Sequence, residues 1–286
     1  MLRAIASLLL LGMVPPTADS VHTASLPSIE VVQVAAPSDI RENLKIPALS
    51  ASGAMLIDLD SGEELFSVNA DTPRPMASLT KIMTALIVLE HHSLDETVTI
   101  PPIAETIGGS TLKAKPGQRL KLSAMLKALL LPSANDVAYS LAVFHGRTVS
   151  NFVSDMNERA AALGMSHTHF NNPAGLDSQQ QYSSPRDLAW LTVAALRQPA
   201  FRATVGMRSA TIVSADGTEF PLTNTNEMLH YNDSVFGVKT GTTDSAGECL
   251  IVAFVSGERS YLLVLLKSAD RYTDALNVLQ AVQNAL

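Results

Sequence analysis

Apolar segments with the character of β-strands lie near both ends of this chain. The segment "GAMLIDLDSGEELFSVN" (residues 53–69) alternates around a polar turn, which predicts a hairpin. The segment "GECLIVAFVSGERSYLLVLLKS" (residues 247–268) predicts two further strands that turn at Ser256 to Arg259. Because strands occur at both extremities with helical patterns between them, we expect an α+β protein whose single sheet is assembled from both ends of the chain.

The middle of the chain has mainly helical patterns. Apolar residues recur with helical spacing in residues 122–144, 149–165 and 184–198, and Gly164 has the position of a helix stop. The last segment, "RYTDALNVLQAVQNAL", predicts an amphipathic helix over residues 272–286. This helix has no Lys or Arg after Arg271, so it lacks the basic face that anionic lipid requires. We therefore expect it to pack on the sheet, with no strong membrane anchor.

Composition excludes several kinds of function. The chain has 286 residues and a formal net charge of -7, which argues against nucleic acid as a partner because phosphate binding requires a basic face. Cys249 is the single cysteine and lies in an apolar run, which predicts a buried, inert thiol. Four histidines stand in adjacent or alternating pairs without the i, i+4 spacing of a zinc-binding helix, so we expect surface histidines and no metal site: His91, His92, His167 and His169.

The N-terminus has the pattern of an export signal. Arg3 is followed by the apolar stretch "AIASLLLLGMV", which is too short to span a bilayer comfortably, and then by small residues suited to cleavage. We predict a signal peptide over residues 1–20, a leader or tether over residues 21–47 and one folded domain over residues 48–286. The protein is therefore expected to work outside the cytoplasm, in the periplasm or an equivalent compartment.

A serine and a lysine share one face of the apolar helix predicted in "PMASLTKIMTALIVLE" (residues 75–90). Ser78 and Lys81 are three positions apart, so their side chains are within reach of each other. A serine hydroxyl becomes a good nucleophile only when a base takes its proton, and a lysine can do so if burial or a second cation lowers its pKa from about 10.4. The alternatives are a helix cap for Ser78 and a solvated ammonium for Lys81.

Two other short motifs offer partners for this pair. Ser133 and Asn135 lie in a break between apolar helices, where both can project into one cleft or merely cap the next helix. Lys239 follows a strand-like run and supplies the second cation, while Gly241 leaves room for a substrate backbone to pair with the strand. An ordinary strand threonine at position 240 and a bulge at Gly241 are the alternatives.

Short patterns of this kind also occur by chance. The pair Ser110 and Lys113 repeats the serine–lysine spacing in a polar, glycine-rich stretch, and Ser67 with Asn69 repeats the serine–asparagine spacing in a predicted strand. The specific signal is the ordered combination of three motifs, which is typical of β-lactamases and penicillin-binding proteins.

With these motifs the chain resembles the low-molecular-mass penicillin-binding proteins, the serine-type D-alanyl-D-alanine carboxypeptidases. The resemblance covers residues 51–267 and includes "ASLTKIMTAL", "LLLPSANDVAYSLA", "LGMSHTHFNNPAGLD" and "KTGTTDSAGECLIVA". It implies the penicillin-recognising (β-lactamase/transpeptidase-like) fold, an antiparallel sheet flanked by helices plus a mostly helical subdomain. It makes residues 48–286 a D,D-peptidase catalytic domain that needs no metal or organic cofactor.

The resemblance also implies roles for the residues of the three motifs. Ser78 would attack the penultimate D-alanine of a peptidoglycan stem peptide, Lys81 would accept its proton, and Ser133 would pass a proton to the leaving amine. The remaining residues would bind substrate: Asn135, Lys239, Thr240, Gly241 and Thr242. β-Lactam antibiotics would be covalent inhibitors.

Several residues depart from the family pattern, so the sequence does not decide which substrate is preferred. Carboxypeptidases of this kind often have histidine where Thr242 stands, and some have an arginine near the position of Thr225. The shorter members act as D,D-endopeptidases on cross-links, which is the main alternative. A β-lactamase is a weaker alternative because residues 133–239 contain no Glu-x-x-x-Asn pattern. A non-catalytic peptidoglycan-binding module is disfavoured by the intact motifs.

Overall fold

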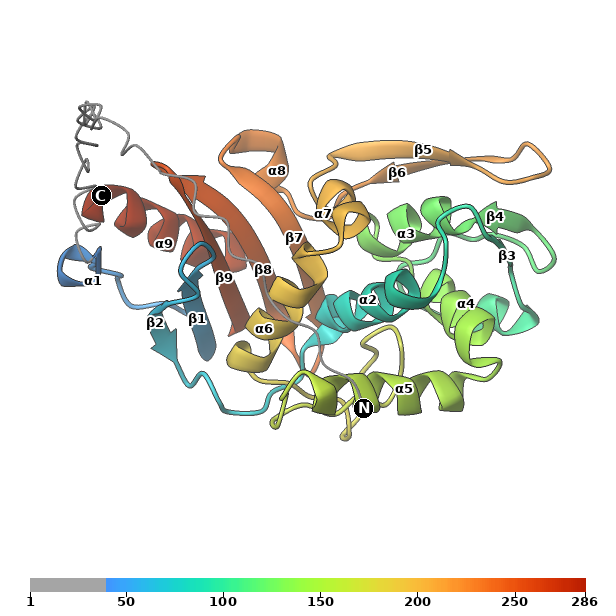
Figure 1. Cartoon of the computed structure of the whole chain (residues 1–286), viewed down its shortest axis with the longest axis horizontal. Coiled ribbons are helices and arrows are strands. Elements are labelled where there is room, and N and C mark those ends of the chain that lie inside the picture. Colours follow the sequence, from blue (N-terminus) through green and yellow to red (C-terminus); the bar gives the residue numbers. More distant parts are fainter. Residues whose placement is uncertain (1–39) are drawn as a thin grey trace, which may run out of the picture. The chain divides into compact units, whose positions relative to one another are not determined.

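The computed structural model describes residues 40–286 (Figure 1). The predicted signal peptide and residues 21–39 of the predicted leader lie outside these residues. Everything described below belongs to one unit, Asp39–Leu286.

The central feature is a five-stranded antiparallel sheet to which both ends of the described chain contribute. Its strand order is β2-β1-β9-β8-β7, so β7 has one free edge. The strands span Gly53–Asp58 (β1), Glu64–Val68 (β2), Val235–Thr243 (β7), Gly247–Ser256 (β8) and Arg259–Ser268 (β9). Strand β1 pairs with β9 from Gly53 opposite Leu266 to Asp58 opposite Tyr261. The predicted hairpins and the predicted sheet from the two extremities are therefore confirmed.

Helices cover both faces of the sheet. Because successive side chains of a strand point to opposite faces, Met55 and Ile57 enter the core beneath α2 (Lys81–His91) and α6 (Pro185–Leu196), whereas Ala54 and Leu56 enter a second core. Helix α9 (Arg271–Ala285) closes that second core on β8 and β9 (Figure 1). The terminal helix thus packs on the sheet as predicted. The middle residues of β8 and β9 are apolar because neither face of the sheet meets water there.

The remaining helices belong mainly to the region between β2 and β7. They span Ala77–Thr80 (η1, a 3₁₀ turn), Pro102–Thr106 (η2), Leu122–Leu130 (α3), Asn135–Gly146 (α4), Val149–Ala162 (α5), Pro199–Val205 (α7) and Met228–Tyr231 (α8), with Ile40–Asn43 (α1) before the sheet. Gly164 follows α5 at a φ of +74°, which confirms the predicted helix stop.

Two small sheets within this region were not predicted. Strands β3 (Thr97–Thr99) and β4 (Arg119–Lys121) form one, and β5 (Ser209–Val213) and β6 (Glu219–Thr223) form the other. These strands are short and partly exposed, and Pro221 within β6 argues against a strand on sequence grounds. A weak period-two pattern of this kind is hard to distinguish from loop.

The single cysteine lies in the core of the protein. Cys249 is fully buried, and burial raises the pKa of its thiol to about 11, so the predicted inert thiol is confirmed. Within residues 40–286, no helix is both long and apolar enough to cross a bilayer.

Candidate active site

Ser78 lies in the 3₁₀ turn η1, immediately before α2. Its side chain caps neither η1 nor α2, and its Oγ lies 2.9 Å from Lys81 Nζ instead. The preceding residue, Ala77, has a φ of +48°, a conformation that costs free energy in any residue with a side chain. The alternative of a simple helix cap is therefore not realised, and the strained turn holds the hydroxyl against the amine.

The Lys81 amine is completely buried and has three oxygen partners. Besides Ser78 Oγ, its Nζ lies 2.7 Å from Asn135 Oδ1 and 2.6 Å from the backbone oxygen of Ala174. These two carbonyl oxygens can only accept hydrogen bonds. A neutral amine has two hydrogens and one lone pair, so the two carbonyls engage both hydrogens and leave the lone pair facing the Ser78 hydroxyl.

The surroundings favour this neutral form. Burial lowers the pKa of Lys81 well below its usual value, and the positive charge of Lys239 lowers it further, while Asp136 acts in the opposite direction. Burial and a second cation are the two causes of a lowered Lys81 pKa that the sequence analysis predicted. The solvated ammonium that was the alternative is absent.

Ser133 lies in the break between α3 and α4, as predicted, and Asn135 is the first residue of α4. Neither caps α4, which has no side-chain hydrogen bond at its N-cap. Ser133 adopts a φ of +64°, and its buried Oγ has no hydrogen-bond partner within residues 40–286. Because buried hydroxyls are normally paired, this one is available to a ligand.

The chance pattern at Ser110 lies beside Asn135. The backbone oxygen of Ser110 accepts a hydrogen bond of 2.7 Å from the Asn135 N–H, and the oxygen of Gly108 accepts one of 2.8 Å from Asn135 Nδ2. Ser110 Oγ donates to the backbone oxygen of Pro132. This loop therefore orients Asn135, and its serine hydroxyl is occupied elsewhere.

Strand β7 brings the third motif against Ser78. A Cβ added to Gly241 would lie 2.9 Å from both the Ser78 nitrogen and the Ala77 Cβ, so only glycine allows this approach. Lys239 is buried, and its Nζ donates to the backbone oxygen of Thr240 over 2.9 Å. Burial, with the nearby charge of Arg271, lowers the pKa of Lys239 to about 7.

Arg271 is a site residue that the sequence analysis did not select. Its Nη1 donates to Thr242 Oγ1 over 2.7 Å and to the backbone oxygen of Gly241 over 3.1 Å. Thr225, considered in sequence because some relatives have arginine near it, shares a hydrogen bond of 2.6 Å with Thr240 Oγ1. Arg271 follows the lysine–threonine–glycine motif by about thirty residues, and the strands between them fold it back, so no local spacing indicates its role.

The loop at Asn172 supplies the carbonyl that binds Lys81. Asn172 Oδ1 accepts hydrogen bonds from the backbone N–H groups of Ala174, Gly175 and Leu176, at 3.1, 2.8 and 3.1 Å. A Cβ on Gly175 would lie 1.9 Å from the Ala77 oxygen. The loop is therefore a tight turn that packs directly against the residue before Ser78.

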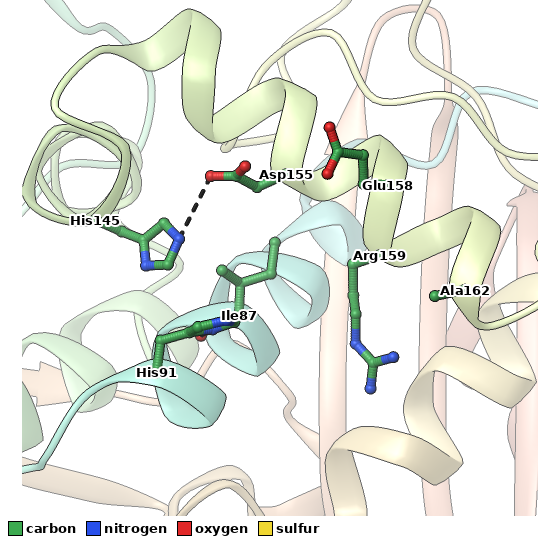
Figure 2. A pocket seen from close by; sticks show the side chains of 7 residues that line it. All are labelled: Ile87, His91, His145, Asp155, Glu158, Arg159 and Ala162. Carbon is green, nitrogen blue, oxygen red and sulfur yellow. Dashed lines mark hydrogen bonds and ion pairs between the residues drawn. The ribbon is translucent and has the colours of Figure 1, made fainter.

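A separate pocket of about 400 Å³ lies between α2, α4 and α5 (Figure 2). Figure 2 shows His145 pointing toward Asp155, with an Nε2 to Oδ2 distance of 3.4 Å, and His91 on α2 below it. His92 Nε2 lies 3.0 Å from His145 Nδ1. Across residues 40–286 no group of three or more His, Cys, Asp or Glu side chains is arranged to hold a metal ion. None of the predicted site residues lines this pocket.

The sequence was compared with models of protein families and with known proteins. Residues 40–270 match the family described as D-alanyl-D-alanine carboxypeptidase. The chain belongs to this family. It is 31% identical to the D-alanyl-D-alanine carboxypeptidase DacF of Bacillus subtilis, over 76% of this chain and 57% of that protein. It is also 31% identical to the D-alanyl-D-alanine endopeptidase of Escherichia coli, over 79% of this chain and 74% of that protein.

The fold agrees with the family. The crystal structure of the Streptomyces K15 DD-transpeptidase matches 83% of this chain and 98% of that chain, with a TM-score of 0.79 and 30% sequence identity. The predicted resemblance to penicillin-binding D-alanyl-D-alanine carboxypeptidases, the predicted fold and the predicted enzyme class are therefore confirmed at the level of the family. The chain spans a little more than half of the longer Bacillus relative.

Proposed function

We propose that this chain is a serine D,D-peptidase that removes the terminal D-alanine of peptidoglycan stem peptides through an acyl-enzyme. The observation that carries the proposal is the arrangement around Lys81, a buried amine whose two carbonyl partners leave its lone pair for the Ser78 hydroxyl. A base positioned in this way converts a weak nucleophile into a strong one.

In the acylation step, Ser78 Oγ attacks the carbonyl of the penultimate D-alanine while Lys81 Nζ takes the hydroxyl proton. The negative charge that develops on the carbonyl oxygen is stabilised by the backbone N–H groups of Ser78 and Thr242. The close approach of Gly241 to the Ser78 nitrogen supports this assignment, because it places the residue before Thr242 beside the nucleophile.

The C–N bond then breaks, and the departing D-alanine needs a proton on its nitrogen. Ser133 is the proposed relay because its buried hydroxyl lacks a partner and lies two residues from Asn135, which holds Lys81. Asn135 also binds the substrate amide. Water hydrolyses the acyl-enzyme in the second half of the reaction and regenerates Ser78.

Two cations of the site suit the C-terminal carboxylate of the substrate. Lys239 and Arg271 flank the threonines of β7, and Arg271 Nη1 already donates to Thr242 Oγ1. The hydroxyls of Thr240 and Thr242 complete the proposed binding site for this carboxylate. Arg271 thus replaces the arginine that the sequence lacks near Thr225.

The main test is labelling with a fluorescent penicillin. The wild-type protein should form a covalent adduct that survives denaturation, and Ser78→Ala should form none. Persistent labelling of the Ser78→Ala variant would show that the nucleophile is a different residue.

The alternative function is a D,D-endopeptidase that cuts cross-links between stem peptides. It is favoured by the similarity to the Escherichia coli endopeptidase, of which the chain covers 74%. Turnover of monomeric pentapeptide muropeptides beside cross-linked dimers separates the two activities. Either activity requires export, which we assign to the predicted signal peptide over residues 1–20, with residues 48–286 as the catalytic domain.

A further inference from the structure

A second cavity, of about 560 Å³, adjoins the end of β7 beyond Thr242. Its lining includes Arg74, Asp177, Gln181, Tyr182 and Ser245. It lies close to the nucleophile in the chain as well, because Arg74 precedes Ser78 by four residues. None of its lining residues takes part in the reaction steps given above.

The direction of β7 fixes which part of a substrate would meet this cavity. The proposed binding site for the C-terminal carboxylate spans Lys239 to Thr242 on the free edge strand β7, which ends at Thr243. A peptide that pairs antiparallel with β7 runs in the opposite direction to the strand. Its residues before the scissile bond therefore pass Thr243 and reach the cavity beside Ser245.

Arg74 is the unsatisfied group in this cavity. Its backbone is fixed, because its N–H donates to the Ser183 oxygen over 2.8 Å and its own oxygen accepts from the Ser183 N–H over 2.9 Å. Its Nε is buried and has no hydrogen-bond partner within residues 40–286. Arg74 as a whole is half-buried and lines the cavity, and carboxylates are the best-matched partners of a guanidinium.

The one carboxylate lining the cavity is already occupied. Asp177 Oδ1 accepts a hydrogen bond of 2.6 Å from Thr243 Oγ1, and Asp177 Oδ2 accepts one of 3.1 Å from the Ser245 N–H. Asp177 thereby fastens the wall of the cavity to the end of β7 and does not pair with Arg74. The cavity is held open next to the substrate strand, with a cation in its wall.

We propose that Arg74 determines specificity by binding a carboxylate that the stem peptide carries on the N-terminal side of its two D-alanines. This inference rests on the proposed function, because it assumes that a peptide lies along β7. The carboxylate can belong to the residue immediately before the D-alanines or to the one before that, and the test separates these two sources.

The test measures kcat/KM for D-alanine release from three acetylated tetrapeptides that end in D-Ala-D-Ala. One carries a side-chain carboxylate directly before the D-alanines, one carries it a residue earlier, and the third has the corresponding amide at both positions. We expect the wild type to prefer one acidic peptide over the amide peptide by about ten- to a hundredfold, as for a hydrogen bond between charged groups. Arg74→Gln should abolish this preference, and Arg74→Lys should retain part of it.

The matched control is Arg197→Gln. Arg197 is an exposed arginine at the C-terminal end of α6, whereas Arg74 pairs with Ser183 just before the N-terminal end of that helix, and this variant should behave as the wild type. A wild type that treats the three peptides alike, or an Arg74→Gln variant that keeps the preference, would overturn the inference. The outcome is separable from failure of the proposed function, because penicillin G carries no carboxylate in its acyl side chain. If penicillin G labels Ser78 at the same rate in the wild type and Arg74→Gln while the peptides are not distinguished, only the inference about Arg74 fails.

Discussion

Replacing Gly241 with alanine tests whether β7 and the nucleophile work as one unit. The added Cβ would lie 2.9 Å from the Ser78 nitrogen and the Ala77 Cβ, and 3.3 Å from the Met76 oxygen. Ordinary contacts of this kind are about 3.4 to 4 Å, so the strand and the turn must separate by about 0.5 to 1 Å. The neighbouring atoms belong to backbone or to a Cβ, so no flexible side chain can move aside.

The expected result is a large loss of acylation with a modest loss of stability. A displacement of about 1 Å in a catalytic arrangement costs about a hundredfold in rate, which corresponds to about 2.7 kcal/mol. Overpacking of this size lowers the free energy of unfolding by about 1 to 3 kcal/mol, so the variant should still fold. The assay is the second-order rate constant for labelling by fluorescent penicillin, with urea unfolding measured on the same samples.

Gly108→Ala is the control, because a Cβ at Gly108 meets no atom within 4 Å and the backbone oxygen that Asn135 uses remains in place. This variant should stay within about 0.5 kcal/mol of the wild type in stability and label at a similar rate. A folded Gly241→Ala protein that labels as fast as the wild type would refute the reasoning, since the contact between β7 and Ser78 would then not matter for reactivity.

Three other substitutions test further contacts of the structure. Lys239→Ala should move the acid limb of the pH profile of the acylation rate to higher pH. Losing the positive charge of Lys239 raises the pKa of Lys81, so less neutral Lys81 remains at low pH. Lys239→Arg keeps the charge and should leave the acid limb in place. Arg271→Gln should raise KM about ten- to a hundredfold for peptides with a free C-terminal carboxylate, while a C-terminally amidated peptide should show no such change. Asp274→Asn should lower the free energy of unfolding by about 2 to 4 kcal/mol in urea titrations. Both carboxylate oxygens of Asp274 accept hydrogen bonds from Ser50, and an amide has only one acceptor oxygen. An unchanged midpoint of urea unfolding would contradict this prediction.

Much of the secondary structure could be predicted from the sequence because it depends on local sequence patterns. The strand pairs at the two ends are uninterrupted apolar runs around polar turns, and Gly164 ends a helix through its own backbone conformation. The weaker hairpin of β5 and β6 was missed because its half-exposed strands contain Pro221 and lack a strong alternation. The motif residues were also found in sequence, since the spacing of Ser78 and Lys81 depends only on a helical turn.

The remaining site features depend on segments far apart in the chain. The amino-acid sequence alone shows which groups are available: a hydroxyl beside an amine, an amide two residues after a serine, and a lysine on a strand. The folded structure adds that Arg271 contacts Thr242, that the Ala174 oxygen engages Lys81, and that Arg74 Nε has no hydrogen-bond partner within residues 40–286. The physical reason is that hydrogen bonding and burial act through space, so the partners that fix the protonation and orientation of each group are set by sheet register and loop packing.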